Sequence, residues 1–90
     1  MMTSWPPVPP EQKSKFSALR EILEEYDRAR QLHPGGMHSA HEGFAVLKEE
    51  VDELWDEVKR NATKERMAQE AVQIGAMALA FLVEVCGVKE

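Results

Sequence analysis

The chain has 90 residues, 11 of them basic and 16 acidic, so that its net charge is −5. This length corresponds to one domain, and so short a chain buries only about 60–65% of its unfolded surface, so oligomerisation is expected to complete the core. The acidic balance, with no basic stripe interleaved with aromatic residues, argues against nucleic acid as a direct partner.

Residues 1–10 are expected to form a proline-rich N-terminal segment, and residues 11–90 a single all-α domain. The four prolines between positions 6 and 10 fix φ and lack an N–H, which predicts an extended conformation. A first helix is predicted from Glu11 to about Gln31, and the sequence His33-Pro34-Gly35-Gly36 ends it. Its apolar residues recur at three- and four-residue spacing: Phe16, Leu19, Ile22, Leu23, Tyr26, Ala29 and Leu32.

A second helix is predicted from Ser39, an N-cap, to about Arg60. Glu42 stands three residues after Ser39, which predicts a capping box. A core stripe is expected on one face of this helix, made of Phe44, Leu47, Val51, Leu54 and Val58. A ridge of acids borders the stripe through Glu50 and continues over Glu42, Glu49, Glu53, Asp56 and Glu57.

A third helix is predicted from Lys64 to Cys86, with Thr63 as its N-cap and Gly87 at its C-terminal end. Apolar residues lie on every side of this helix between positions 71 and 85, which predicts burial on every side. Three helices cannot surround one of their own number. We therefore expect a homo-oligomer, a dimer or tetramer, that forms a helical bundle.

The compartment is inferred from what the sequence lacks. Cys86 is the only cysteine, which fits a reducing compartment and the role of a small apolar residue at a helix end. The N-terminus lacks a basic region followed by an apolar run, and the longest apolar stretch, residues 74–83, is too short to cross a bilayer. We expect a cytoplasmic protein without membrane contact.

The acid ridge has a cost, because like charges at i,i+3 and i,i+4 spacing each destabilise a helix by a few tenths of a kcal/mol. A solvated helix face is one explanation. The other is a hard divalent cation, which takes oxygen ligands and removes the repulsion. Glu70, at the start of the apolar part of the third helix, has two explanations as well. It either stabilises the helix dipole or, beside Glu50 and Glu53, has a raised pKa or binds a metal.

Two short motifs carry a resemblance to a known family. Glu49-Glu50-Val51-Asp52-Glu53 matches the motif E-E-x-x-E, and Glu70-Ala71-Val72-Gln73 lies where the family has E-x-x-D. With the flanking residues 41–47 and the order of helices, the chain resembles MazG-like all-α nucleoside triphosphate pyrophosphohydrolases over residues 33–87. The resemblance implies a bundle of three main helices per chain, completed by oligomerisation. It also implies Mg²⁺- or Mn²⁺-dependent hydrolysis of a nucleoside triphosphate to the monophosphate and pyrophosphate.

The resemblance also implies roles for single residues. Glu50, Glu53 and Glu70 would be metal ligands, with Gln73 at the fourth metal position. Glu53 would also act on the attacking water, and Glu49 would be a ligand or orient that water. Gln73 departs from the motif, because its amide supplies one neutral oxygen where the family has a carboxylate, and metal affinity should fall. A catalytically weak binding module of the same fold is therefore the alternative to an enzyme, and a structural oligomeric bundle is a third hypothesis.

Cations and aromatic residues complete the predicted substrate site. The base could stack on Trp55, on Phe44 or on an aromatic residue of the first helix, and for Phe44 a place in the core is the favoured explanation. The candidates for phosphate contact, each also explained by ordinary surface charge, are Lys48, Lys59, Lys64 and Arg66. His38 and His41 do not form a zinc pair, because their three-residue spacing differs from that of H-E-x-x-H and no third ligand is evident.

Overall fold

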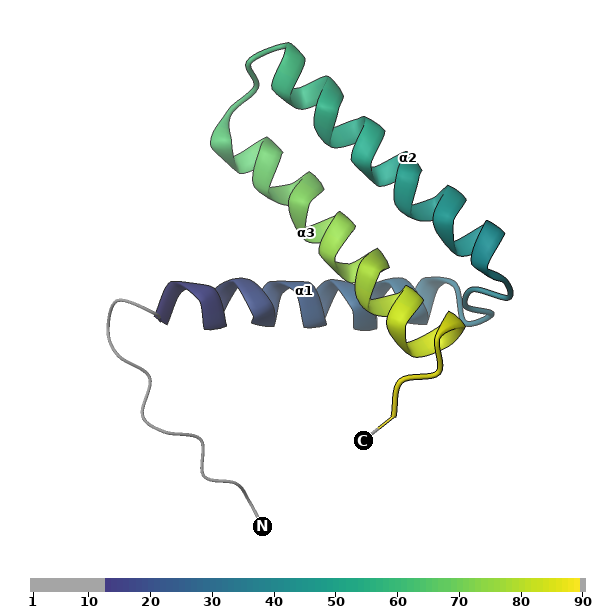
Figure 1. The fold of residues 1–90 in the computed structure, drawn as a ribbon. Coiled ribbons are helices and arrows are strands. Elements are labelled where there is room, and N and C mark those ends of the chain that lie inside the picture. Colours follow the sequence, from purple (N-terminus) through teal and green to yellow (C-terminus); the bar gives the residue numbers. More distant parts are fainter. Residues whose placement is uncertain (1–12, 90) are drawn as a thin grey trace.

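The computed structural model describes residues 13–89, and this part of the chain is all-α (Figure 1). Its elements are α1 (Lys13–Leu32), α2 (Ala40–Lys59), α3 (Lys64–Ala80) and a π-helical turn, η2 (Phe81–Val85). No strand occurs between residues 13 and 89. The predicted proline-rich segment 1–10 and the predicted helix start at Glu11 lie outside the described residues.

The helix ends follow the capping residues that the sequence predicts. The Ser39 hydroxyl accepts a hydrogen bond from the Glu42 amide at 3.1 Å, and Thr63 accepts one from the Arg66 amide at 3.2 Å. The capping box at Ser39 is only half formed, because the Glu42 carboxylate accepts from the His38 amide instead. After η2, Gly87 takes a φ of +70°, a left-handed conformation that glycine adopts without strain.

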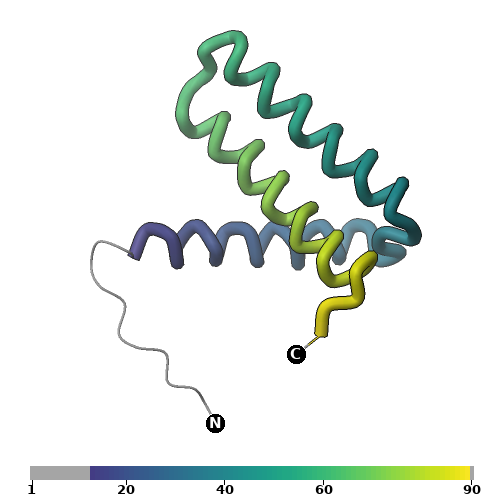
Figure 2. Tube along the Cα trace, viewed as in Figure 1, coloured from purple at the N-terminus to yellow at the C-terminus, as the bar shows by residue number. Residues whose placement is uncertain are grey.

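The three helices are arranged as an antiparallel hairpin of α2 and α3, with α1 crossing α3 (Figures 1 and 2). Within residues 13–89, α3 packs against both other helices, whereas α1 and α2 do not pack directly against each other. The molecule measures 39 × 34 × 19 Å, so it is about two helix diameters thick. Each helix therefore keeps one face that no other helix within the described residues covers.

Two glycines allow the helices to approach closely. A Cβ at Gly75 of α3 would lie 2.7 Å from Cδ1 of Ile22, where α1 crosses. A Cβ at Gly43 of α2 would lie 2.7 Å from Cδ2 of Phe81. The buried apolar core beside these contacts is small and consists of Met37, Ala76, Met77 and Ala80.

The predicted core stripe of α2 is only partly correct. Leu47 and Leu54 are half-buried, but Phe44 and Val51 are 61% and 46% exposed, and Val58 is exposed as well. The reason is that Gly43 faces η2, and this close approach turns the helix so that its inner face runs through positions 43, 47, 50, 54 and 57. Two acids, Glu50 and Glu57, therefore lie against α3, and an apolar row faces outward.

The third helix is likewise not buried on every side. Ala76, Met77 and Ala80 are buried between α1 and α2, but Leu82 and Val83 are exposed at the far end. The continuous helical segment Lys64–Val85 is, by length and composition alone, long and apolar enough to cross a membrane. This segment is longer than the apolar stretch of residues 74–83 considered in the sequence. A core helix of a soluble protein meets the same criterion, so this feature does not assign a location.

Candidate metal centre

Three glutamates converge between α2 and α3. Glu50 and Glu53 are three residues apart on α2, which places them on neighbouring positions of one face, and Glu70 comes from the second turn of α3. One carboxylate oxygen from each lies within 4.8 Å of the other two. The antiparallel hairpin produces this meeting, because it sets the first half of α3 against the second half of α2. Acids that are 17 to 20 positions apart in the sequence thus share one site.

The electrostatics of the site favour binding of protons or cations. Burial, followed by the charge of Glu53 and a hydrogen bond shared with it, raises the pKa of Glu50 to about 7. The pKa of Glu70 is also raised, first by burial and then by the charge and hydrogen bond of Glu53. Glu53 is therefore the member that couples the other two. The raised pKa values of Glu50 and Glu70 mean that their carboxyl groups hold protons more readily than free glutamates, and a bound cation would replace such protons.

The spacing of the carboxylates suits a small divalent ion. Mg²⁺ binds oxygen at about 2.0–2.1 Å, so two ligands on opposite sides of the ion are about 4.2 Å apart. One oxygen from each glutamate lies within 4.8 Å of the other two, which is compatible with this spacing. Waters would complete an octahedron around an ion held by the three carboxylates. The donor set is oxygen only and anionic, which suits Mg²⁺ or Mn²⁺ better than zinc.

Glu49 and Gln73 border this cluster without belonging to the three-carboxylate group. Glu49 is exposed beside Glu50, and its charge contributes to the raised pKa of Glu50. Gln73 is half-buried one turn after Glu70. The pKa of Glu25 of α1 is lowered chiefly by Arg28 and in part by the Gln73 amide, so the amide at position 73 lies near α1. Its predicted role as a metal ligand stays a prediction.

Arg66 is the predicted cation that lies nearest the cluster. Its guanidinium donates to both carboxylate oxygens of Glu57, at 3.1 and 3.0 Å. The pKa of Glu57 is lowered by this hydrogen bond and by the charge of Arg66, against the effect of burial. The positive charge of Arg66 also acts to lower the pKa of Glu70, so Arg66 influences the acid cluster electrostatically.

The other predicted substrate contacts lie elsewhere on the surface. Lys48 pairs with Asp52 at 2.9 Å, and Lys59 lies 5.8 Å from the centre of the Trp55 ring. On a helix these three candidates lie about 140–180° around α2 from Glu50, so they face away from the cluster in one chain. Lys64 is exposed at the first position of α3. Their substrate roles stay predictions.

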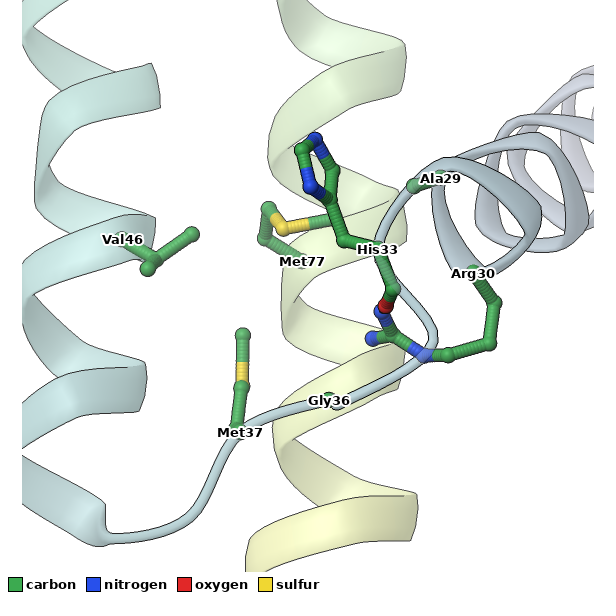
Figure 3. Close-up of a pocket in the computed structure, with 7 residues that line it drawn as sticks. All are labelled: Ala29, Arg30, His33, Gly36, Met37, Val46 and Met77. Carbon is green, nitrogen blue, oxygen red and sulfur yellow. The ribbon is translucent and has the colours of Figure 1, made fainter.

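A cavity of about 160 Å³ opens in the same α2–α3 groove, toward the end of α1. Figure 3 shows Val46 of α2 and Met77 of α3 facing each other across it, with Met37 reaching in from the loop below. Val46 lies one turn before Glu50 on α2, and Met77 lies two turns after Glu70 on α3. The remaining lining residues are Ala29, Arg30, His33 and Gly36.

Sequence analysis missed the cavity and the inward position of Glu57. The signal for Glu57 is its spacing of seven from Glu50, which places both on one helix face. The cavity has no such signal, because it forms where a loop and three helices meet. Neither the family models nor the curated proteins nor the solved structures compared with this chain match it.

Proposed function

We propose that the chain is a Mg²⁺- or Mn²⁺-dependent nucleoside triphosphate pyrophosphohydrolase, similar to the MazG-like enzymes and acting in nucleotide-pool house-cleaning. The observation that supports this proposal most is the convergence of Glu50, Glu53 and Glu70 within 4.8 Å. Such a cluster is destabilising unless a proton or cation binds to it. The two sequence motifs that suggested the family supply these three residues.

The proposed reaction converts a nucleoside triphosphate and water to the monophosphate, pyrophosphate and a proton. The water oxygen forms a bond to the α-phosphorus, and the bond from the α-phosphorus to the oxygen bridging to the β-phosphorus breaks. Glu53, with Glu49 at the exposed rim, orients the water and accepts its proton. Glu50, Glu53 and Glu70 would hold the ion, with Gln73 as a weaker neighbour. When bound, the ion neutralises the phosphates and polarises the α-phosphorus.

Cations and the neighbouring cavity complete the proposed substrate site. Arg66 and Lys64 lie at the start of α3, four and six residues before Glu70, and are assigned to the phosphates. The charge of Arg66 acts on the pKa of Glu70. The cavity lined by Val46 and Met77 is assigned to the nucleobase, because it is apolar and continues the groove one to two turns beyond the cluster. Trp55, Lys48 and Lys59 face outward, so a contact from them would require a second copy of the chain.

One observation favours a second candidate function, a binding module without turnover. Gln73 has a neutral amide that lies near Glu25 of α1, and the cluster found among residues 13–89 has three carboxylates. Three carboxylates suffice for Mg²⁺, which commonly keeps several waters. We place the enzyme first and propose that it acts in the cytoplasm as a homodimer or homotetramer.

The test is a screen of standard and modified ribo- and deoxynucleoside triphosphates for release of pyrophosphate by the full chain with Mg²⁺. Equal amounts of monophosphate and pyrophosphate are expected from at least one nucleotide. Glu53→Gln should lower the rate by about 100-fold or more, because it removes a proton acceptor and a ligand charge. Asp52→Asn is the matched control, since Asp52 is exposed on the same helix and pairs with Lys48.

Metal binding separates the two candidate functions. Calorimetry should show Mg²⁺ binding to the wild type and weakened binding to Glu53→Gln and Glu70→Gln. Binding of metal and nucleotide without product would support the binding module. No metal binding, or equal rates in Glu53→Gln and Asp52→Asn, would refute the site.

A further inference from the structure

A second polar cluster lies at the opposite end of the α2–α3 groove and centres on Glu84 in η2. The Glu84 carboxylate accepts hydrogen bonds from the Tyr26 hydroxyl at 2.9 Å, from Arg30 Nε at 2.6 Å and Nη2 at 2.8 Å, and from the Met37 amide at 3.0 Å. These partners come from α1 and from the loop between α1 and α2. One side chain therefore ties three parts of the chain together.

The loop between α1 and α2 is shaped to receive this carboxylate. Gly36 has a φ of +69°, and a Cβ there would lie 3.1 Å from Glu84 Oε1. Arg30 donates from Nη1 to the His33 carbonyl at 2.8 Å while its other nitrogens hold Glu84. The start of the loop is thus fixed through Arg30, and its end is fixed through the Met37 amide.

The π-helical turn brings Glu84 to this place. In η2 the Cys86 amide donates to the Phe81 carbonyl at 3.0 Å, five residues back, so the turn is one residue wider than an α-helical turn. Such turns inside α-helices occur frequently at functional sites. Burial would raise the pKa of Glu84, but the bonds from Met37, Arg30 and Tyr26 outweigh it and lower the pKa. The carboxylate is therefore ionised at neutral pH and holds its partners as an anion.

The residues held by Glu84 form one side of the cavity. Arg30, His33, Gly36 and Met37 are four of its seven lining residues, and Figure 3 shows them along the loop and the end of α1. The opposite side is carried by the helices themselves, through Val46 and Met77. The loop side has little apolar packing of its own, because apart from Met37 its residues are polar or lack a side chain. Its position depends on the Glu84 bonds.

We propose that Glu84 is a positioning residue that fixes the His33–Met37 loop and so sets how tightly the cavity holds the nucleobase end of the substrate. This proposal rests on the proposed function for its substrate. Glu84 touches neither the acid cluster nor the reacting atoms. Its loss should weaken nucleotide binding and leave the chemical step and the metal site intact.

The test compares Glu84→Gln with wild type in two measurements. Glu84→Gln keeps the size of the side chain and one acceptor for the Met37 amide but loses the charged pair with Arg30. We expect KM for the best nucleotide to rise about tenfold, with kcat and Mg²⁺ affinity close to wild type, since hydrogen bonds to charged groups are the stronger ones. Amide exchange in residues 33–37 should be about tenfold faster, with α2 unchanged.

Gly36→Ala gives the same test without removing a charge. Its Cβ would press on Glu84 Oε1 at a positive φ, so the loop should shift and KM should rise as in Glu84→Gln. Glu65→Gln, an exposed acid in the first turn of α3, is the control and should match wild type in KM and exchange.

The outcomes separate this proposal from the proposed function. Faster exchange in the loop together with a raised KM supports the positioning role. Exchange unchanged in both variants would overturn it, and so would a fall in kcat at constant KM. If the wild type hydrolyses no nucleotide, the proposed function fails. Exchange in the loop and binding of nucleoside monophosphates by calorimetry then still decide the role of Glu84.

Discussion

Arg66 on α3 holds both carboxylate oxygens of Glu57 on α2, at 3.1 and 3.0 Å. Glu57 is buried on the inner face of α2, although its neighbours Asp56 and Val58 are exposed. The pair lies beside the three-glutamate cluster, since both of its members influence the pKa of Glu70. Arg66 therefore compensates one inward acid of α2, whereas no cation within residues 13–89 forms an ion pair with Glu50.

Removal of Arg66 should lower the thermal stability of the protein and raise the pKa of Glu70. Arg66→Ala leaves the Glu57 carboxylate in the interface without its bidentate partner, so the melting temperature should fall by a few degrees. The pKa of Glu70 should rise further because a neighbouring positive charge is lost. Arg60→Ala is the control, since Arg60 lies 3.8 Å from Glu57 and is a weaker partner. Equal melting temperatures for the two variants would contradict this account.

Glu50→Gln should stabilise the protein, and more so at higher pH. An acid whose folded pKa is raised contributes stability below its unfolded pKa, near 4.5, which is lost as pH rises through about 7. Because glutamine does not ionise, the Glu50→Gln variant does not lose this stability as the pH rises. With allowance for solvent screening, we expect a gain of about 1 kcal/mol above pH 7, or about 4–8 °C in melting temperature.

The measurement is thermal unfolding of Glu50→Gln and wild type from pH 5 to pH 8.5 without divalent metal. The difference in melting temperature should grow with pH and level off above pH 7. Mg²⁺ should raise the melting temperature of the wild type and narrow the difference. A difference that is constant over this range would show that the pKa of Glu50 is not raised.

Gln73→Asp should tighten Mg²⁺ binding, because it adds a carboxylate one turn from Glu70. The substitution also replaces the amide that helps to lower the pKa of Glu25, so two acids would lie near each other between α1 and α3. We therefore expect lower stability without metal and a larger rise in melting temperature when Mg²⁺ is added. Gln73→Leu, which removes the amide without adding charge, is the matched control.

Calorimetric titration with Mg²⁺ gives the deciding measurement for position 73. Tighter binding in Gln73→Asp than in both wild type and Gln73→Leu supports a place for this residue at the metal. If binding is unchanged, the side chain at position 73 serves only the contact between α3 and α1.

The helices could be predicted from the sequence because their signals are local. Apolar periodicity, the caps Ser39 and Thr63, and the break at 33–36 each act over a few residues, and the structure has α2 and α3 starting where predicted. The prediction of which face of α2 points inward was wrong by part of a turn, because a prediction from hydrophobicity alone places acids on the outer face. The contact that decides it, between Gly43 and Phe81, joins positions 38 residues apart.

The acid cluster was predictable from the sequence, whereas the cavity and the Glu84 bonds were not. The spacing of Glu50 and Glu53 places both on one helix face, and a short turn at 61–63 makes α3 return along α2, so Glu70 meets them. The Glu84 bonds join positions 47 to 58 residues apart and depend on a π-helical turn. No local pattern in the sequence signals either feature.

The outward apolar row of α2 predicts self-association through this face. Phe44, Val51, Trp55 and Val58 recur at three-, four- and seven-residue spacing and are all exposed, with Trp55 at 57%. An exposed apolar row of this kind, interrupted only by Lys48 within residues 44–58, is typical of an interaction surface on a small domain. Sedimentation equilibrium should show a dimer or tetramer for the wild type, and Val51→Lys or Trp55→Glu should shift it toward monomer.

Leu23→Lys provides the comparison for this last prediction. Leu23 is 53% exposed on α1, so the substitution adds the same charge as Val51→Lys to a different apolar face. If α2 forms the interface, Leu23→Lys stays associated. If Leu23→Lys alone dissociates the protein, the interface lies on α1 and the row on α2 must be explained otherwise. A wild type that is monomeric at micromolar concentration would contradict an interface on α2 as well as one on α1, because the apolar row would then be exposed to solvent without a partner.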